Sequence, residues 1–333
     1  MSRSLCTLSK GMMIALCNAS KLSVTSHDVK VKKQLSQFNK TPLKFIKSKD
    51  GDVIDCVDIS QQPAFDDPLL KNHNIKMRPN NYPESAFVEA NNKPITQLWQ
   101  LNGRCPTGTI PIRRTKKEDV LRAISIKSNI GKKQNYNFHK TSQDNVEYVI
   151  AAVEGESYHG AKASINVWEP QVENHNAVSS SQLWIYGGPY KSSNLNIIEA
   201  GWHDPSHDVW WLGFGSRTNG YWTTIGYWPS SLFTTLANNA SAIEWGGLVV
   251  SSESDGQQTT TQMGSGHFPE EGFSRASYMR NLQVMDESFN SRPLSNPSTN
   301  ANQPNCYNIT LGKTNGWGDF IFYGGPGRNP NCP

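Results

Sequence analysis

Two glutamates in strongly apolar segments are the residues of this sequence best suited to acid–base chemistry. Glu199 lies in IIEAGW, between Ile198 and Trp202, and Glu244 lies in AIEWGG. A carboxyl group in apolar surroundings is costly to ionise, so its pKa tends to be raised. Two such carboxyls in one cleft titrate at different pH values, so one can act as acid and the other as base in hydrolysis. Alternatively, each glutamate faces solvent from the outer side of its strand, and composition alone favours this interpretation.

Other reactive side chains give weaker indications of a functional site. Residues 203–208 read HDPSHD and supply two imidazoles and two carboxylates for a metal, although a solvated turn around the proline explains the same pattern. The members of a Ser/His/Asp triad are distant in any chain, so a triad is not excluded, but no nucleophile-elbow context is present. The sequence contains no GxGxxG, P-loop or CxxC pattern. These absences argue against nucleotide binding and against a metal site.

The segments around both glutamates have the pattern of short β-strands. Residues 146–333 contain EYVIAAVEG, SQLWIYGG, DVWWLGFG and DFIFYGG, which are rich in aromatic and β-branched residues and separated by Gly, Pro and Asn. Many short strands at regular spacing predict an antiparallel β-sandwich or barrel. One helix is expected among them, at about residues 230–238.

Residues 28–127 have the pattern of a small mixed domain. A helix is expected over residues 26–38, where apolar side chains recur at i, i+4 and i+7 with lysines on the other face. LKFIKSKDGDVIDCV predicts a hairpin that turns at residues 50–51, an Asp-Gly pair. Residues 115–118 have capping-box spacing, which predicts the start of a second helix. The N-terminal region is therefore expected to be α+β.

The net charge of +4 conceals a division of the 333-residue chain. Residues 1–145 carry 24 Lys and Arg against 12 Asp and Glu, a net of +12, and residues 146–333 carry 8 against 16, a net of −8. One interpretation is that the basic half binds nucleic acid or a membrane; the other is that it docks on the acidic half of its own chain. Scattered lysines and the absence of nucleic-acid-binding motifs favour the second.

The N-terminus and the cysteines indicate whether the protein is exported or stays in the cytosol. A short apolar MMIALC follows Arg3 and Lys10 and forms a weak signal peptide, and the longest apolar run, residues 11–17, is too short to cross a bilayer. The cysteines show no zinc-ligand spacing. For an exported protein, one disulfide in each half is the economical arrangement, and a cytosolic protein would keep the thiols reduced. The candidate pairs are Cys56 with Cys105 and Cys306 with Cys332.

N-x-S/T tripeptides start at Asn39, Asn239 and Asn308. Each would be a glycosylation acceptor in a secreted protein, although such tripeptides are common by chance.

Longer strings of the sequence closely resemble the plant neprosin family. Residues 50–79 and 97–123 resemble its activation peptide, and YHGAKASINVWEPQV, NIIEAGW, QMGSGHFPEEGFSRASYMRNLQV and FYGGPGRNPNCP resemble its catalytic domain. The resemblance implies a secreted, latent precursor with a β-sandwich that needs no cofactor. It implies the activity of a glutamic endopeptidase that cuts after proline at acid pH, with Glu199 as the first catalytic glutamate.

The sequence departs from this family in two places. Where the family has WGGEV, with the second catalytic glutamate, this chain has WGGLV, so leucine stands at position 248. Glu244 is a substitute on the same face of a regular strand, but about 13 Å away at ~3.3 Å per residue. In addition, Trp202 runs directly into HDPSHDVWW, where family members have an intervening stretch of roughly 60–70 residues, enough for several strands. A faulty gene model or a degenerate gene copy would explain both the gap and the weak signal peptide.

These observations define one prediction for the chain. Residues 1–27 are a signal-like or disordered N-terminus, 28–127 an α+β prodomain, 128–145 a linker, and 146–333 an all-β antiparallel sandwich that lacks several strands. The expected function is that of a secreted, neprosin-like glutamic endopeptidase homologue, impaired or inactive, with Glu199 and Glu244 as site residues. Its expected partners are a proline-containing peptide or protein substrate and its own prodomain, with no nucleic acid and no membrane. The alternative is a non-catalytic sandwich that binds peptide or cell-wall polymer through exposed aromatic residues.

Overall fold

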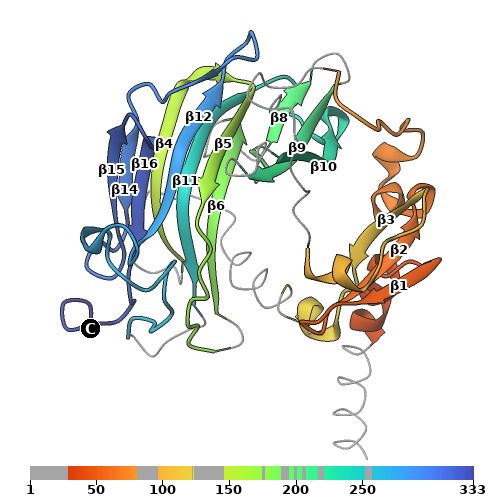
Figure 1. Cartoon of the computed structure of the whole chain (residues 1–333), viewed down its shortest axis with the longest axis horizontal. Helices are drawn as coiled ribbons and strands as arrows, with labels where there is room; N and C mark the ends of the chain where they lie inside the picture. Colours follow the sequence, from red (N-terminus) through yellow and green to blue (C-terminus); the bar gives the residue numbers. More distant parts are fainter. Residues whose placement is uncertain are drawn as a thin grey trace, which may run out of the picture. The chain divides into compact units, whose positions relative to one another are not determined.

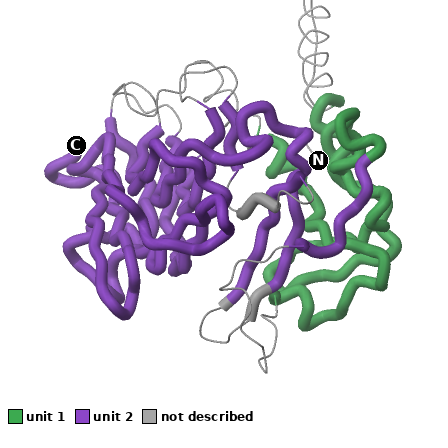
Figure 2. The backbone as a smooth tube through the Cα atoms, turned by 90° about the horizontal axis from the view of Figure 1, so that it is seen from above, with its two compact units in different colours: residues 1–72, 96–125 green, residues 73–95, 126–333 purple. Residues whose placement is uncertain are grey.

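The computed structural model of the protein divides into two compact units (Figure 2). Unit 1 comprises residues 1–72 and 96–125, and unit 2 comprises residues 73–95 and 126–333. The structure describes residues 29–80, 97–121, 123, 146–174, 177–188, 195–198, 201–204, 208–216, 221–251 and 257–333, with the side chains of 201–204, 216, 221 and 222 excepted. Within these ranges, none of the helices combines the length and the apolar character that crossing a membrane requires.

Unit 1 is a three-stranded antiparallel sheet with short helices, which confirms the predicted α+β class. Its strands, in spatial order, are β1 (Lys44–Lys47), β2 (Val53–Asp58) and β3 (Thr109–Arg113). Its helical segments are residues 29–38, residues 117–121 and the 3-10 turns η1 (Ile59–Gln61), η2 (Pro63–Asp66), η3 (Pro68–Leu70) and η5 (Leu98–Asn102). The β1–β2 hairpin turns where predicted, since the N–H of Ser48 donates to the carbonyl of Asp52 at 2.8 Å.

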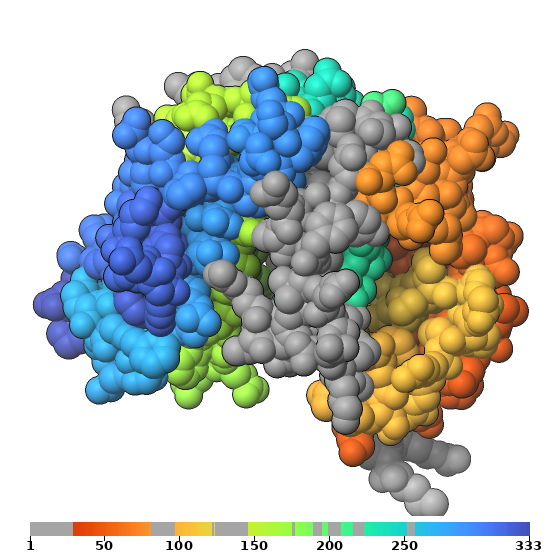
Figure 3. All heavy atoms as spheres, turned by 45° about the horizontal axis from the view of Figure 1, so that its top comes forward, coloured from red at the N-terminus to blue at the C-terminus, as the bar shows by residue number. Residues whose placement is uncertain are grey.

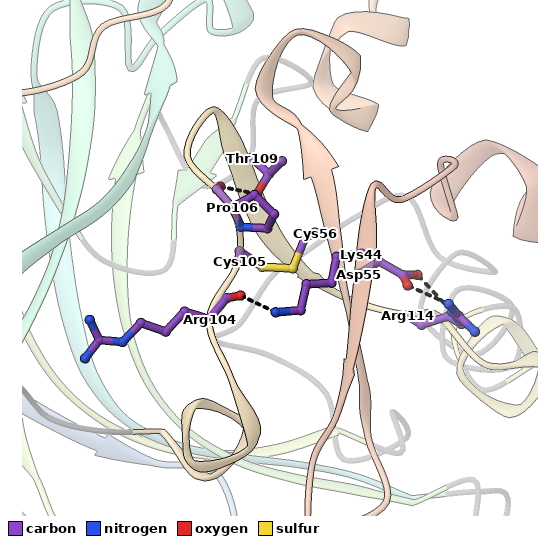
Figure 4. Close-up of a disulfide and its surroundings, with 8 residues drawn as sticks. All are labelled: Lys44, Asp55, Cys56, Arg104, Cys105, Pro106, Thr109 and Arg114. Atoms are coloured by element: carbon purple, nitrogen blue, oxygen red, sulfur yellow. Dashed lines mark hydrogen bonds and ion pairs between the residues drawn. A yellow bond between two sulfur atoms is a disulfide. The ribbon is translucent and has the colours of Figure 1, made fainter.

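A disulfide and an ion pair fix the middle strand of unit 1 (Figure 4). Cys56 of β2 is joined to Cys105, with 5.4 Å between their Cα atoms. The adjacent Asp55 is 3% exposed, and the Arg114 guanidinium donates to both of its oxygens, from Nε at 2.8 Å and from Nη2 at 2.6 Å. A buried carboxylate needs such a compensating charge, so this pair ties β2 to the segment after β3.

Unit 2 is an antiparallel β-sandwich of two sheets (Figure 1), as the strand pattern predicted. The eight-stranded sheet contains, in spatial order, β10 (Tyr221–Pro229), β9 (Val209–Ser216), β8 (Gly201–Asp204), β5 (Gly160–Ile165), β12 (Ser277–Met285), β16 (Gly318–Gly324) and β15 (Asn308–Thr314), with β13 (Ser291–Arg292) paired to β12. The five-stranded sheet contains β14 (Ser298–Ala301), β4 (Val146–Tyr158), β11 (Ala240–Val250), β6 (Val178–Gly187) and β7 (Asn196–Ile198). Two 3-10 turns, η6 (Ser230–Leu232) and η7 (Pro269–Glu271), lie between strands.

The main hydrophobic core of unit 2 is built from alternate residues of both sheets. Side chains two apart on a strand point to the same face, so each strand contributes one row to the core. The five-stranded sheet supplies Val149, Ala151, Leu183, Ile185, Ile243 and Trp245, and the eight-stranded sheet supplies Trp210, Met279, Leu282, Ile321 and Tyr323. The disulfide between Cys306 and Cys332 belongs to the same cluster. Burial of each large side chain stabilises the fold by about 1.5–3 kcal/mol.

The helix predicted at residues 230–238 is wrong beyond its first turn. Only the 3-10 turn η6 forms there, and the chain then bends. The side-chain oxygen of Asn196 on β7 accepts the backbone N–H groups of Thr234 and Thr235, at 2.8 and 2.7 Å. Further on, Trp210 donates its indole N–H to the carbonyl of Leu236 at 2.7 Å. Because these partners satisfy the backbone from other strands, the segment does not continue as a helix.

Residues 73–80 contact the outer face of the eight-stranded sheet. The ring nitrogen Nε2 of His73 lies 2.7 Å from the hydroxyl of Tyr227 on β10, and the N–H of Lys76 donates to the same oxygen at 2.9 Å. Tyr227 packs on a second hydrophobic cluster, formed by Val209, Trp211 and Met285. Burial, and to a lesser extent the charge of Lys76, lowers the pKa of His73. The neutral imidazole is therefore the form that fits this contact.

A buried carboxyl, Glu147, lies at one end of the sandwich core. It is 7% exposed at the start of β4, and its side chain is directed to the phenol of Tyr307, whose O–H donates to the carbonyl of Thr261 at 2.7 Å. Burial raises the pKa of Glu147 to about 7, although the nearby phenol of Tyr307 opposes the shift. Glu173, which accepts from Thr259 Oγ1 at 2.9 Å, is a second acidic group near Tyr307. Glu147 is thus held as a neutral acid below neutral pH.

We predict that replacing Arg114 weakens unit 1. The variant Arg114→Ala leaves Asp55 buried without its bidentate partner, and a lost hydrogen bond to a charged group typically costs about 1.5–3 kcal/mol. Thermal unfolding of the full chain should show an earlier transition for unit 1 with the transition of unit 2 unchanged. Arg113→Ala is the control, because its guanidinium contacts the more exposed Asp52 and Asp119 at longer distances of 3.7 and 3.3 Å. Equal shifts for both variants would contradict the prediction.

We also predict that Glu147 makes the sandwich more stable in acid. The folded carboxyl keeps its proton up to about pH 7, whereas its ordinary pKa is 4.5. The resulting stabilisation is complete below the ordinary value and is lost as pH rises through 7, a change on the order of 3 kcal/mol. Urea unfolding of Glu147→Gln should match the native chain near pH 4 and show a more stable protein near pH 8. Glu154→Gln, on an exposed position of the same strand, should follow the native pH curve; parallel curves for all three proteins would refute the assignment.

Candidate functional site

The strand that carries Glu244 is the central strand of the five-stranded sheet. β11 pairs along its length with β4 on one side and with β6 on the other, so that Glu244 lies opposite Ala152 and Trp184. Alternation places Ile243, Trp245 and Val249 in the sandwich core. Glu244 therefore belongs to the opposite face of this sheet.

The face around Glu244 is a buried, aromatic surface, which we call the Glu244 face. It comprises Tyr148 and Ile150 of β4, Trp184 and Tyr186 of β6 and Ala242 of β11, with Leu195 and Leu248 packed against them. Glu244 itself is 2% exposed. The prediction that Glu244 lies in an aromatic setting is confirmed, and the alternative that it faces solvent is wrong.

A phenol holds the Glu244 carboxyl in place. The O–H of Tyr186 donates to Oε2 of Glu244 at 2.8 Å. The pKa of a second phenol, that of Tyr148, is raised mainly by burial and to a lesser extent by the negative charge of Glu244. Donors to the charged form favour a carboxylate, while burial disfavours it. Such a group is equipped to accept or to give a proton within an apolar site.

Leu248 lies on the same face as Glu244. It is opposite Tyr148 on β4 and Ser180 on β6, and it packs on the aromatic cluster. Between the two residues stands Gly246, where a Cβ atom would lie 1.9 Å from the carbonyl oxygen of Val149, so only glycine permits this approach of β4. Leucine can neither accept nor donate a proton. The position at which the family resemblance places its second glutamate is therefore apolar here.

The side chain of Glu199 lies outside the described residues. The described part of β7 ends one residue earlier, at Ile198, which is in the sandwich core. The preceding residue, Ile197, lies opposite Tyr186 on β6, and Tyr186 is the donor to Glu244. The strand that leads into Glu199 is thus separated from β11 by a single strand of the same sheet.

The HDPSHD segment is only partly described. Its two imidazoles and Asp204 have no described side chains, and Asp208 accepts the backbone N–H of Ser230 at 2.8 Å through its own carbonyl. Among the side chains that the structure describes, no three or more of His, Cys, Asp and Glu converge in a way that would hold a metal ion.

The sequence analysis missed the phenols that surround Glu244. Tyr148 and Tyr186 stand in the segments EYVIAAVEG and SQLWIYGG, which were recognised only as strands. Because they alternate with core residues, the sequence could have assigned each tyrosine to the outer face of its strand. It could not have shown that both lie beside Glu244. That neighbourhood requires the order β4-β11-β6 and its register, which the sequence does not specify.

Two known protein families match parts of the chain. The neprosin activation peptide family matches residues 45–163, and the neprosin family matches residues 202–326. The first match runs from the second residue of β1 through β4 and into β5, and the second contains β11 with Glu244 and Leu248. Residues 164–201, which include Glu199, lie between the two matched regions. The chain therefore belongs to the neprosin family and carries that family's activation peptide.

Proposed function

We propose that this chain is the latent, secreted precursor of a glutamic endopeptidase homologue, in which Glu199 and Glu244 form the carboxylate pair and Leu248 limits activity. The observation that carries the proposal is the buried Glu244 carboxyl, which accepts a hydrogen bond from Tyr186 on an aromatic face. Membership of the neprosin family and the strand order β7-β6-β11 support the pairing with Glu199. The two disulfides support an oxidising, exported compartment.

In the proposed reaction, the two carboxyls handle the protons of peptide hydrolysis. The Glu244 carboxylate takes a proton from water as the water oxygen bonds to the peptide carbonyl carbon. Glu199, in its acid form, gives a proton to the amide nitrogen as the C–N bond breaks. Tyr186 donates to Glu244, and a donor of this kind favours the charged form of a carboxyl, so Glu244 is assigned the role of base. Proline-containing peptides at acid pH are the proposed substrates.

The proposed activity is low because the site is incomplete by family standards. General acid–base participation is typically worth 10²- to 10⁴-fold, roughly, and groups that act as a unit lose more than their separate shares. Glu244 lies four residues from Leu248, about 13 Å along a strand that rises ~3.3 Å per residue. A pair built from Glu199 and Glu244 would therefore differ in geometry from the family's pair. Missing strands after Trp202 would loosen it further.

A second candidate function is binding without catalysis. Phe214 and Phe273, on the eight-stranded sheet and after η7, are 53% and 64% exposed. Exposed aromatic side chains on a sandwich are suited to binding a peptide or a cell-wall polymer. The two functions are distinguished by activity, because binding through these rings does not require Glu199 or Glu244.

Latency is supported by a contact and by the charge division. Residues 73–80 fall within the activation-peptide match and contact Tyr227, which falls within the neprosin match. We propose that the basic half docks on the acidic half and that acid releases it. Protonation of carboxylates weakens the attraction, and protonation of His73 disfavours its buried position because burial lowers its pKa.

We predict little or no turnover of a proline-containing peptide by the activated native chain at acid pH. Leu248→Glu should raise turnover by on the order of 10²-fold, since it restores a carboxyl at this position of the Glu244 face. Leu248→Gln is the matched control, with similar size and no titratable group, and should stay inactive. Mass spectrometry of the peptide after incubation measures the products.

Two outcomes would change the assignment. Native turnover that disappears in both Glu199→Gln and Glu244→Gln would refute inactivity and support the pair. Turnover that survives both substitutions would refute the pair. If Leu248→Glu also shows no turnover, the defect is assigned to the shortened sandwich rather than to the leucine.

We further predict acid-dependent release of the activation peptide. A protease site inserted within residues 128–145 of the full chain allows the linker to be cut without denaturation. At pH 7 the cut halves should co-elute in size-exclusion chromatography, and at pH 3 they should separate. Tyr227→Phe, which removes the hydroxyl that contacts His73 and Lys76, should separate at a higher pH than the native chain. Co-elution at both pH values would contradict the proposed release of the basic half by acid.

A further inference from the structure

The eight-stranded sheet carries an aromatic patch on the face that points away from the core. The patch consists of Phe273, Tyr278, Trp317, Phe320 and Phe322, whose rings contact one another with centroids between 4.8 and 6.1 Å apart. The guanidinium of Arg280 lies over the Trp317 ring at 5.2 Å. Such a gathering of rings on an outer sheet face needs a covering to keep it from associating with other molecules.

The same outer face is covered at its other end by the chain itself. There, residues 73–80 lie against Tyr227, above the cluster of Val209, Trp211 and Met285. The patch lies at the end formed by β12, β16 and β15, and β15 is the edge strand of the sheet. An edge strand presents backbone groups to other chains, which natural proteins protect.

An N-glycosylation tripeptide lies beside the patch. Asn308-Ile309-Thr310 opens β15, and alternation directs Asn308 and Thr310 outward, because Tyr307 and Ile309 belong to the core. Thr310 is opposite Phe322 on β16. Two residues further along the same face, Gly312 is covered by the ring of Phe320, which would lie 2.4 Å from a Cβ atom there. The aromatic patch thus continues from the row that contains Asn308.

Asn308 is half-buried, and its amide makes two contacts among those described. Its Nδ2 donates to the exposed Glu270 of η7 at 3.2 Å, and its Oδ1 accepts from the N–H of Ile309 at 2.9 Å. Phe273 of the patch follows three residues after Glu270. A group attached to Nδ2 would therefore emerge between η7 and the aromatic rings.

The tripeptides that start at Asn39 and Asn239 differ in their surroundings. The amide of Asn39 is used inside unit 1, where Nδ2 donates to the carbonyl of Thr115 at 2.9 Å and Oδ1 accepts from its N–H at 2.8 Å. Nδ2 would keep one N–H after attachment, so the preference for Asn308 rests on the aromatic patch beside it. Asn239 lies in the bend before β11, at some distance in sequence from any residue of the patch.

We propose that Asn308 carries an N-linked glycan and that its first sugars lie on the aromatic patch. In the reaction, Nδ2 bonds to the anomeric carbon of a lipid-diphosphate-linked oligosaccharide, the bond from that carbon to the diphosphate oxygen breaks, and Nδ2 loses one proton. The lipid diphosphate is the leaving group. The C–H face of a pyranose packs on aromatic rings by burying apolar area, and the bulky, polar remainder of the glycan would shield the edge strand.

The test uses the full chain secreted by a eukaryotic host. Treatment with peptide N-glycosidase in heavy-oxygen water converts each glycosylated asparagine into labelled aspartate, which peptide mass spectrometry locates. The label is expected at Asn308 in the native chain and in Thr310→Ser, which keeps the acceptor pattern. It should be lost in Thr310→Val, which has almost the same shape and no hydroxyl. An unlabelled Asn308 in the folded, secreted chain would overturn the proposal.

A second measurement tests where the sugars lie. Binding of a hydrophobic fluorescent dye should increase on the order of twofold in Thr310→Val, because the patch is uncovered. In the double variant Thr310→Val with Phe273→Ser, which removes the most exposed ring, the dye signal should fall back toward that of the native chain. Glycosylation at Asn308 without any change in dye binding would refute the patch as its resting surface. This result does not depend on peptidase activity, so its failure and that of the proposed function are distinguishable.

Discussion

The pairing of β11 with β4 and β6 at once is the constraint on which the sandwich and its candidate site depend. This central strand is buried on both faces, with Trp245 in the core and Glu244 on the opposite side. A shift of one residue would exchange the two faces and place the carboxyl in the core. Gly246 fixes the approach of β4, since a side chain there would collide with a backbone carbonyl. Fold and site are thus specified by the same ladder.

Among the contacts that the structure describes, the buried carboxyls have partners of two kinds. Asp55 is paired with Arg114, and Asp319 lies 3.1 Å from Lys313 and accepts the N–H of Leu294 at 2.9 Å. Glu244 and Glu147 instead adjoin the phenols Tyr186 and Tyr307. A cation offsets the cost of burying a carboxylate by its charge, whereas a phenol supplies a neutral hydrogen-bond donor. Glu244 and Glu147, which each lie beside a phenol, are therefore the buried carboxyls best suited to a role in function or in sensing of pH.

The outer face of the eight-stranded sheet links the activation peptide to the sandwich. At β10, residues 73–80 hold Tyr227 through an imidazole and a backbone N–H. Burial lowers the pKa of His73, so acid strong enough to protonate it would weaken this contact, and acid is also the condition in which the proposed carboxyl pair would work. The same acid keeps Glu147 protonated and the core stable. Release of the activation peptide and stability of the sandwich would then respond to pH in compatible directions.

The sequence by itself determined the α+β and sandwich classes, the Asp-Gly hairpin and the family, because strand alternation, turn residues and long identifying strings are local signals. It offered the two cysteine pairs only as the economical arrangement for an exported protein, and the structure contains both. It also indicated Glu244, from its apolar neighbours. Only the tertiary structure decided that Tyr186, 58 residues away, donates to that carboxyl, and that Asn196 from β7 replaces the expected helix after residue 232 with a bend. These contacts depend on strand order and register. Both arise from the packing of the whole sandwich, which no single segment encodes.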